Sequence, residues 1–594
     1  MGKQLIVAEK PSVARDIGRV LGCRSNKDGY MESGKYLVTY AIGHLIALWD
    51  PEDYDPALKR WNYQTLPIIP EPIRTKPYPK TKKQLDLVGR LMEREDVESL
   101  ICATDSGREG ELIFRYIYGY LGCRKPFYRL WISSMTDEAI RQGFEKLKPG
   151  EAYDNLYHSA RCRSEADWLV GINATRAFTT RYGDLYSVGR VQTPTLALIV
   201  QRQLEIEGFK PEDYYEVEAD YGDFKGTWFW KKQSATRMDR EEKAREVADR
   251  CLGKEVQVLE LEKKKNRQPP PFLYDLTELQ RDGNKEHGFT AQQVLTIAQE
   301  LYEKRKLITY PRTDSRFLSD DMKPVAQKTM ESINVHPYSK AIGPLLAKGP
   351  LKFSKRIVDN GKVTDHHAII PTNRRPDPGS LPPDLLKIYQ LVVKRFIAVF
   401  CEPFEFETTK VVMGTEEDTF LSKGKTVLAM GWKGLYQNRN EEGDQLLPPL
   451  KKGEKRTIQD CNLLTKQTSP PKPFTEATLL SAMENAGRFV EDEDLKEQLK
   501  ASGFGTPATR AGIIERLLQV EYIVRKGKAL VPTEKGRRLV ALVPEELKSP
   551  VTTGKWEKGL GRISQGALDP QRFMDSIGRF VRYIVQEAGN PQGR

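Results

Sequence analysis

Apolar and polar positions in the first part of the chain follow the order of a strand and then a helix. Short apolar runs at residues 5–8, 36–42 and 100–103 predict strands. Helical spacing follows at residues 11–21 and again at 111–120. Strands that alternate with helices predict a parallel α/β sheet, which carries its functional residues at the carboxyl ends of its strands.

The pattern changes several times after this first region. Residues 153–181 have helical spacing, whereas 212–262 and 405–465 alternate apolar and polar residues as strands do. We expect the two alternating stretches to complete one sheet, which makes that domain discontinuous. Near the end, a helix through residue 519 is followed by a basic hairpin at 522–531, the order of a winged-helix element.

The chain of 594 residues is too long for one core, and its length predicts about four domains. A basic, proline-rich connector at 263–271 marks one boundary. We therefore predict a multidomain α/β protein with additional α and β domains. Its units are an α/β domain at 1–152, helical parts at 153–211 and 473–594, β-rich parts at 212–271 and 405–472, and a separate unit at 272–404.

Net charge indicates the class of binding partner, since the chain carries a net charge of +12 and has a pI of about 9.0. This excess favours a polyanionic partner, most simply nucleic acid. No phosphate-binding loop of the ATPase type is encoded: Gly424-Lys425-Thr426 resembles its end, but Thr419 stands where the first glycine belongs. We therefore expect no ATP hydrolysis by this chain.

Cysteine spacing argues against a zinc ribbon, and the length of the apolar runs argues against a membrane span. The seven cysteines stand singly with no Cys-x-x-Cys pair, so no zinc ribbon is encoded and a reducing cytosol is expected. The longest apolar runs, such as residues 196–200, are too short to span a bilayer. A charged residue interrupts the N-terminus before a signal-peptide core forms, so we expect an intracellular protein.

Tyr310 is the candidate nucleophile. It ends a short apolar run that Pro311 stops, and upstream Thr290 and Gln293 have the spacing of a capping box that opens a helix. A phenol beside the guanidinium of Arg312 can attack phosphorus, because Arg312 would lower the phenol pKa and neutralise phosphoryl charge. The alternative is a buried tyrosine next to a salt-bridged arginine.

Carboxylates gather at the predicted strand ends. Asp105, Glu109 and Glu111 lie in the turn after the third strand, and Glu9 follows the first strand. Hard oxygen ligands of this kind suit Mg²⁺. The alternative for the turn is an ordinary charged surface loop.

Arginine, glutamine and histidine side chains are further candidates for contacts with a nucleic acid or with the site of Tyr310. Arg161 and Arg163 lie on the predicted long helix, and small residues around Arg190 and Gln192 would let a phosphate backbone approach. Solvated arginines on packed helices are the alternative. In the pair at 366–367, adjacent histidines point in different directions, so at most one is expected to share a site with Tyr310.

Six segments taken in order resemble the type IA DNA topoisomerases, and among them the topoisomerase III branch. They are Ala8-Glu9-Lys10-Pro11-Ser12, the stretch from Ala103 to Glu111, Asp167-Trp168-Leu169-Val170-Gly171-Ile172-Asn173, the Tyr310 stretch, His366-His367-Ala368-Ile369-Ile370-Pro371-Thr372 and Gly505-Thr506-Pro507-Ala508-Thr509-Arg510. One segment alone is weak evidence for the resemblance, but the series of six in this order is specific and covers nearly the whole chain.

The resemblance implies a toroid with an N-terminal Toprim domain, a discontinuous helical groove with winged-helix-like elements, a β-rich arch and a gate domain that carries Tyr310. It implies that one DNA strand is cut through a 5′-phosphotyrosyl link, that another strand passes, and that the break is resealed without ATP. Relaxation of negative supercoils and decatenation would follow.

The resemblance also implies residue roles. Tyr310 would be the nucleophile, Lys10 the general acid or electrostatic partner of the leaving 3′ oxygen, and Arg312 and His367 contacts to the phosphate region. Mg²⁺ would be held by Glu9, Asp105 and Glu109, and Glu9 would also take part in catalysis. The residues expected to bind DNA are Arg161, Arg163, Ser187, Gly189, Arg190, Gln192, Thr193, Thr309, Thr313, Ser315, Thr506 and Arg510.

One position departs from the family pattern. Many relatives have an acid where this chain has Gly107, which puts a two-metal arrangement in doubt; we expect one Mg²⁺, with Glu111 as a further candidate ligand. The implied partners are single-stranded and underwound duplex DNA, with a helicase or single-strand-binding protein left open. We expect a monomer in the cytoplasm, associated with the nucleoid and not with a membrane.

Two other functions stay open from the sequence alone. A Toprim nuclease or primase would share Glu9 and Asp105, would not need Tyr310, and would leave free DNA ends. A basic single-strand-binding protein would carry out no chemistry. A covalent protein–DNA adduct would distinguish the topoisomerase hypothesis from both of these alternatives.

Overall fold

The computed structural model describes residues 2–231, 234–374, 379, 381–415, 417–436, 445–490 and 492–590. The N-terminal region is built on a seven-stranded sheet of order β2-β3-β4-β1-β7-β8-β9. Its strands are β1 (Lys3–Ala8), β2 (Ser25–Lys27), β3 (Tyr30–Glu32), β4 (Tyr36–Tyr40), β7 (Val97–Ala103), β8 (Phe127–Arg129) and β9 (Lys148–Pro149). The three predicted strands are confirmed as β1, β4 and β7.

The centre of this sheet is parallel, as predicted, but its edges are not. β1 pairs in parallel with β4 and β7, and β7 with β8, whereas β2, β3 and β9 pair in antiparallel fashion. The sheet is therefore mixed. In the register of the central pair Ala8 faces Ala103, so the residues that follow these two strands emerge side by side.

Helices cover both faces of the first sheet, which explains why β1 is apolar throughout. Leu5 and Val7 pack with α3 (Lys82–Glu93) and α4 (Arg108–Tyr120). Ile6 and Ala8 pack on the opposite face with α1 (Pro11–Val20) and α5 (Asp137–Glu145). A strand buried on both faces needs a continuous apolar run, not an alternating one.

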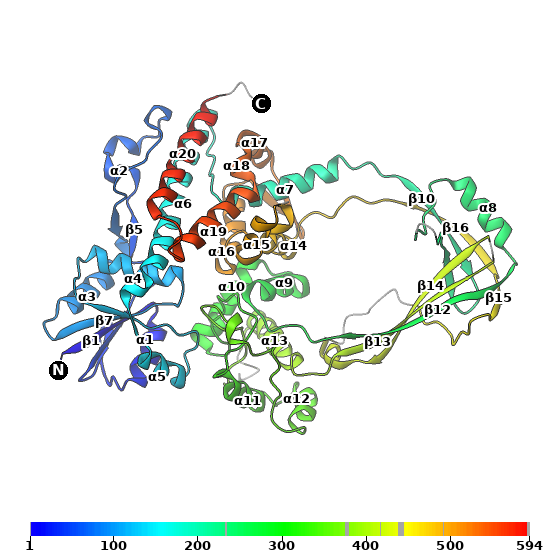
Figure 1. Cartoon of the computed structure of the whole chain (residues 1–594), viewed down its shortest axis with the longest axis horizontal. Helices are drawn as coiled ribbons and strands as arrows, with labels where there is room; N and C mark the ends of the chain where they lie inside the picture. The colour runs from blue at the N-terminus through cyan, green and yellow to red at the C-terminus, as the bar shows by residue number, and fades with distance from the viewer. Residues whose placement is uncertain are drawn as a thin grey trace.

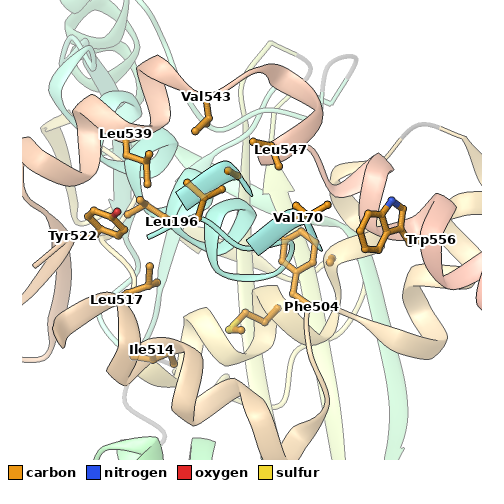
Figure 2. Packing of buried hydrophobic residues seen from close by; sticks show 14 of the residues in the cluster. Val170, Leu196, Phe504, Ile514, Leu517, Tyr522, Leu539, Val543, Leu547 and Trp556 are labelled. Atoms are coloured by element: carbon orange, nitrogen blue, oxygen red, sulfur yellow. The ribbon is translucent and has the colours of Figure 1, made fainter. Parts of the chain in front are cut away.

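A helical core joins the middle of the chain to its end. α6 (Asp154–Tyr182) confirms the predicted long helix, and α7 (Gln192–Glu207) follows it. The C-terminal elements are α14 (Glu476–Glu484), α15 (Glu493–Ser502), α16 (Pro507–Gln519), β17 (Ile523–Lys526), β18 (Ala529–Pro532), α17 (Glu534–Leu542), α18 (Glu545–Lys548), α19 (Pro550–Ser564) and α20 (Pro570–Gly589). Figure 2 shows Val170 of α6 and Leu196 of α7 in one apolar cluster with Leu517, Tyr522 and Trp556.

The two alternating stretches form one seven-stranded sheet, as predicted, of order β15-β12-β13-β14-β11-β10-β16. The strands are β10 (Asp213–Asp220), β11 (Lys225–Trp228), β12 (Glu255–Gln268), β13 (Phe404–Gly414), β14 (Thr419–Ala429), β15 (Lys455–Thr457) and β16 (Asp460–Gln467). α8 (Glu241–Cys251) packs on this sheet. The sheet lies far from the helical core (Figure 1). The linkers to α7 and α14 on one side, and the long strands β12 and β13 that lead to residues 272–404 on the other, enclose an open ring.

Residues 272–404, which we call the tyrosine segment, have an apolar core of their own. Its helices are α9 (Leu276–His287), α10 (Ala291–Glu300), α11 (Met322–Ser332), α12 (Ser339–Leu346) and α13 (Pro383–Ala398). The predicted capping box is present: the Gln293 N–H donates to Thr290 Oγ1 at 3.1 Å, and the Thr290 N–H donates to the Gln293 side chain at 2.8 Å. A π-helical turn, Leu301–Arg305, then leads into the Tyr310 stretch.

The division of the chain at residues 152, 211, 271, 404 and 472 stays a prediction about independent units. Within the described residues, no helix is long and apolar enough to cross a bilayer.

Candidate functional site

The candidate site lies where the first sheet meets the tyrosine segment. A cavity of about 440 Å³ is lined from one side by residues that include Lys10 and Asp105, and from the other by residues that include Tyr302, Tyr310 and His366. The strand ends of β1 and β7 are adjacent in the sheet register, which places Lys10 beside Asp105. The fold therefore brings together side chains that are 300 positions apart.

Lys10 is the centre of the site. Its Nζ donates hydrogen bonds to Asp105 Oδ2 at 2.8 Å and to Tyr310 Oη at 2.9 Å, and lies 3.4 Å from Glu9 Oε1. Burial alone would lower the pKa of Lys10, but the charges of Asp105 and Glu9 outweigh burial and hold that pKa above its ordinary value. Lys10 is therefore an ammonium ion in this site.

The Tyr310 ring is enclosed by aromatic neighbours. The ring centroid of Tyr302 lies 5.4 Å from it and that of His366 lies 4.3 Å from it. Burial raises the pKa of Tyr310 to about 12, and the positive charge of Lys10 opposes that rise. The phenol is thus protonated at neutral pH, and Lys10 is the cation that favours its ionisation.

Arg312 does not have the place that we expected. Its side chain is exposed, and its guanidinium lies beside the carboxamide of Gln299, with Nη2 2.7 Å from the amide oxygen in the orientation that satisfies both groups. The prediction that Arg312 lowers the pKa of Tyr310 is therefore wrong, because Lys10 is the cation beside the phenol and burial raises the pKa. Pro311 is buried, whereas the next residue, Arg312, is exposed.

Several hydroxyl groups fix the backbone around Tyr310. Thr309 Oγ1 donates to Ala368 O at 3.1 Å, Thr313 Oγ1 donates to His366 O at 2.9 Å, and Ser315 Oγ donates to Lys362 O at 3.0 Å. The Thr309 N–H also donates to Ile370 O at 2.9 Å. These bonds join the Tyr310 stretch to residues 362–370, and DNA contacts of Thr309, Thr313 and Ser315 stay a prediction.

His366, not His367, is the histidine that lies beside Asp105 and the Tyr310 ring. His366 Nε2 lies 3.3 Å from Asp105 Oδ2, and with Lys10 it holds the pKa of Asp105 below its ordinary value in spite of burial. His367 also lines the cavity, but its Nδ1 lies 2.8 Å from Ala368 O, and burial lowers its pKa. The sequence offered two adjacent histidines, and nothing in their spacing told which one faces Tyr310.

The predicted carboxylate ligands are not gathered in one cluster. Glu109 accepts from His44 at 2.5 Å, and that contact lowers its pKa. Glu111 is fully buried, 2.9 Å from Arg115 and 3.0 Å from Arg129, so it does not face the cavity. Among the residues that the structure describes, no group of three or more acidic, histidine or cysteine side chains is arranged to hold a metal.

Glu9 and Asp105 nevertheless fit a hard cation. Both face the Lys10 ammonium, a cation already held between them. Burial, reinforced by the charge of Asp105, raises the pKa of Glu9, so added positive charge would favour its ionised form. Mg²⁺ commonly uses one or two carboxylates and completes its shell with water and phosphate.

Gly107 explains how the tyrosine segment approaches so closely. A Cβ atom at Gly107 would lie 2.3 Å from Asp365 Oδ2, which means that the Asp365 carboxylate occupies the space where a side chain would stand. Burial and the charges of Asp314 and Asp105 raise the pKa of Asp365 to about 6. Asp365 was not among the predicted residues, because no local pattern marks a contact across 258 positions of chain.

The predicted groove arginines are divided between the surface and the interior. Arg161 and Arg163 are half-buried on α6. Arg190 is buried against Asp167 at 2.8 Å and Glu557 at 3.1 Å, and buried Arg510 donates to Thr277 at 2.8 Å. Our expectation that Arg190 and Arg510 line an open groove is thus corrected for this conformation, in which both join helices.

The remaining predicted DNA contacts surround these arginines. The Gly189 N–H donates to Thr193 Oγ1 at 3.2 Å. This bond joins buried Thr193, in the first turn of α7, to the loop before the helix. Gln192 Nε2 donates to Ser187 O at 3.4 Å. Thr506 is exposed and caps α16 together with Thr509.

Comparisons with known proteins agree over nearly the whole chain. Residues 151–575 match the DNA topoisomerase family, and residues 4–135 match the Toprim domain. DNA topoisomerase 3 of Bacillus subtilis is 45% identical over 599 residues, which cover 99% of this chain and 82% of that protein. DNA topoisomerase 3 of Bacillus licheniformis is likewise 45% identical, over 595 residues with the same shares.

A solved structure shows the same fold. Full-length topoisomerase I from Thermotoga maritima superimposes with a TM-score of 0.72 at 22% identity, and the match covers 98% of this chain and 90% of that one.

The Gly107–Asp365 contact is open to a direct test. We expect Gly107→Ala to destabilise the chain by about 1–2 kcal/mol, because its methyl group displaces the Asp365 carboxylate. Asp365→Gly in the same background should recover most of this loss. Thermal unfolding of both single variants and the double variant measures the coupling; purely additive effects would show that the two residues do not meet.

Proposed function

Because the chain belongs to the type IA DNA topoisomerases, in the topoisomerase 3 branch, we propose that it cuts one DNA strand through a 5′-phosphotyrosyl link at Tyr310. A second strand passes through the break, and the link is reversed. The observation that carries this proposal is the 2.9 Å hydrogen bond from Lys10 Nζ to Tyr310 Oη across the cavity. It joins the Toprim domain to the segment that holds the phenol.

Each bond made in the proposed cleavage is matched by one broken. Tyr310 Oη forms a bond to phosphorus, and the bond from phosphorus to the 3′ oxygen breaks. The phenol loses a proton and the 3′ oxygen gains one, so no proton is consumed overall. One ester replaces another, which agrees with a sequence that encodes no ATPase-type phosphate-binding loop.

Lys10 is suited to stabilise negative charge and to act as a general acid, not as a general base. It is already protonated, and it donates to the oxygen on which negative charge develops as the phenol ionises. The same ammonium can protonate the departing 3′ oxygen. Asp105 accepts a hydrogen bond from Lys10, and His366 lies against the Tyr310 ring.

Glu9 and Asp105 are the proposed holders of Mg²⁺, which when bound supplies positive charge near the phosphate. Glu109, on the first turn of α4, stays a candidate metal ligand, but it would have to break its contact with His44 to bind Mg²⁺. Arg312 keeps a proposed role as a phosphate contact from the exposed side of the Tyr310 turn. Arg161 and Arg163 are the proposed groove residues with accessible side chains.

The closed arrangement implies that the tyrosine segment separates from the Toprim domain during strand passage. Besides the contacts of Lys10, Asp105 and Gly107 described above, Thr136 Oγ1 donates to Asp321 Oδ2 at 2.9 Å, and Ser134 Oγ lies 3.7 Å from the Met322 sulfur. We propose single-stranded and underwound DNA as substrate, relaxation and decatenation as outcomes, and a cytoplasmic, nucleoid-associated monomer.

The nucleophile can be tested by trapping the adduct. Denaturing the protein abruptly with end-labelled single-stranded DNA and Mg²⁺ should leave label on the protein through a 5′ link, and Tyr310→Phe should abolish it. Tyr302→Phe is the matched control, because Tyr302 lines the same cavity and should still form the adduct. Free cleaved ends in every lane, without an adduct, would favour a Toprim nuclease instead.

The role of Lys10 can be tested by charge removal. Lys10→Met should slow adduct formation by about 10²- to 10⁴-fold, because the pKa of Tyr310 rises further and the leaving oxygen loses its proton donor. Lys306→Met removes the same charge from the same cavity and should affect DNA affinity more than the rate. Single-turnover cleavage with saturating DNA separates these effects; equal losses of rate would remove Lys10 from its proposed role.

A further inference from the structure

Helix α14 of the helical core lies against the two helices with which the tyrosine segment begins. Its buried side chains Leu479, Leu480 and Met483 share one apolar cluster with Leu276 of α9 and Leu295 of α10. Apolar packing of this kind keeps neighbouring helices at a fixed spacing. The start of the tyrosine segment therefore rests on α14.

Glu476, the first residue of α14, holds the start of α10. Its side chain is buried, and Oε2 accepts a hydrogen bond at 2.6 Å from the N–H of Ala291, the first residue of α10. The first N–H groups of a helix have no partner within the helix and carry partial positive charge, so a carboxylate there is stabilising. The other oxygen accepts two hydrogen bonds from Arg525 of β17, at 2.9 and 2.7 Å, which fixes the direction of the carboxylate.

Glu484, the last residue of α14, holds the chain beyond Tyr310. Its Oε1 accepts a hydrogen bond from Arg316 Nη2 at 3.0 Å. Arg316 Nε donates in turn to Asp275 Oδ2 at 2.5 Å, just before α9. The two ends of α14 therefore contact the chain on both sides of Tyr310.

A continuous hydrogen-bonded path connects α10 to Tyr310. The helix ends at Glu300 and passes directly into the π-helical turn Leu301–Arg305, and the Leu307 N–H donates to Leu301 O at 2.9 Å. A displacement at the start of α10 is therefore carried toward the phenol. A shift of about 1 Å in a reacting atom can slow a reaction about 10²-fold.

We propose that Glu476 and Glu484 are positioning residues for the nucleophile, which hold the Tyr310 stretch in register with the phosphate that it attacks. The proposal rests on the proposed cleavage at Tyr310. Neither carboxylate is among the residues that line the catalytic cavity, so both act through the backbone that carries the phenol. The helical core thus sets where Tyr310 stands, together with Lys10 of the Toprim domain.

Adduct formation in a single turnover tests this role in the full chain. A 3′-labelled single strand with a short leaving fragment makes the adduct irreversible, because that fragment dissociates. The rate constant at saturating DNA then reports the alignment of Tyr310, and the amplitude reports the fraction of folded protein. We expect Glu476→Met to lower the rate constant about 10- to 100-fold, with amplitude and DNA affinity unchanged. Glu476→Gln keeps an oxygen acceptor for the Ala291 N–H and should recover most of the rate.

Glu515→Met is the matched control. Glu515 also accepts a hydrogen bond from Arg525, at 2.5 Å, but among the described residues its carboxylate has no hydrogen bond with α10. This variant should react like the unchanged protein, whereas Glu484→Met should be slowed as Glu476→Met is.

Three outcomes would overturn the proposal. An unchanged rate constant in Glu476→Met would show that the contact with α10 does not align the phenol. A loss of amplitude alone would mean that the carboxylate only stabilises the fold, and equal slowing by Glu515→Met would assign the effect to Arg525. The unchanged protein reports separately on the proposed function, since the absence of any adduct there would contradict cleavage at Tyr310 itself.

Discussion

One half-buried positive charge holds the site together. The Lys10 ammonium lies between the carboxylates of Glu9 and Asp105 and also donates to the Tyr310 phenol. Without it, two carboxylates would face a buried phenol, and each negative charge would raise the pKa of the others. Because Lys10 follows β1 and Tyr310 belongs to a distant segment, the same charge sets the electrostatics of the cavity and links its two walls.

The two walls of the cavity have separate apolar cores, and polar side chains join them. The tyrosine segment has its own apolar core, and Thr309 and Thr313 hold the Tyr310 stretch to neighbouring backbone. Across the cavity the contacts are single hydrogen bonds such as Thr136 to Asp321. Polar contacts of this kind can separate without unfolding either side, because water replaces each partner. This property suits the separation that we propose for the tyrosine segment.

Periodicity and capping predicted much of the fold because those signals are local. The apolar run of β1, the capping box at Thr290 and Gln293, and the alternation of the second sheet each reflect the burial of their own side chains. The site was less predictable. Which of two adjacent histidines faces Tyr310, and whether Arg190 is exposed, depend on segments that meet only after folding.

The basic residues also divide by chemistry, which net charge alone does not reveal. Arg190 and Arg510 are buried and join helices through directional hydrogen bonds, a use that suits the planar, multi-donor guanidinium. Lys264 and Lys423 instead face solvent on a ribbon, where a compact hydrated ammonium can meet a phosphate in many orientations. The excess of positive charge in the sequence therefore combines a buried part, which joins helices, with a part that is exposed on the surface.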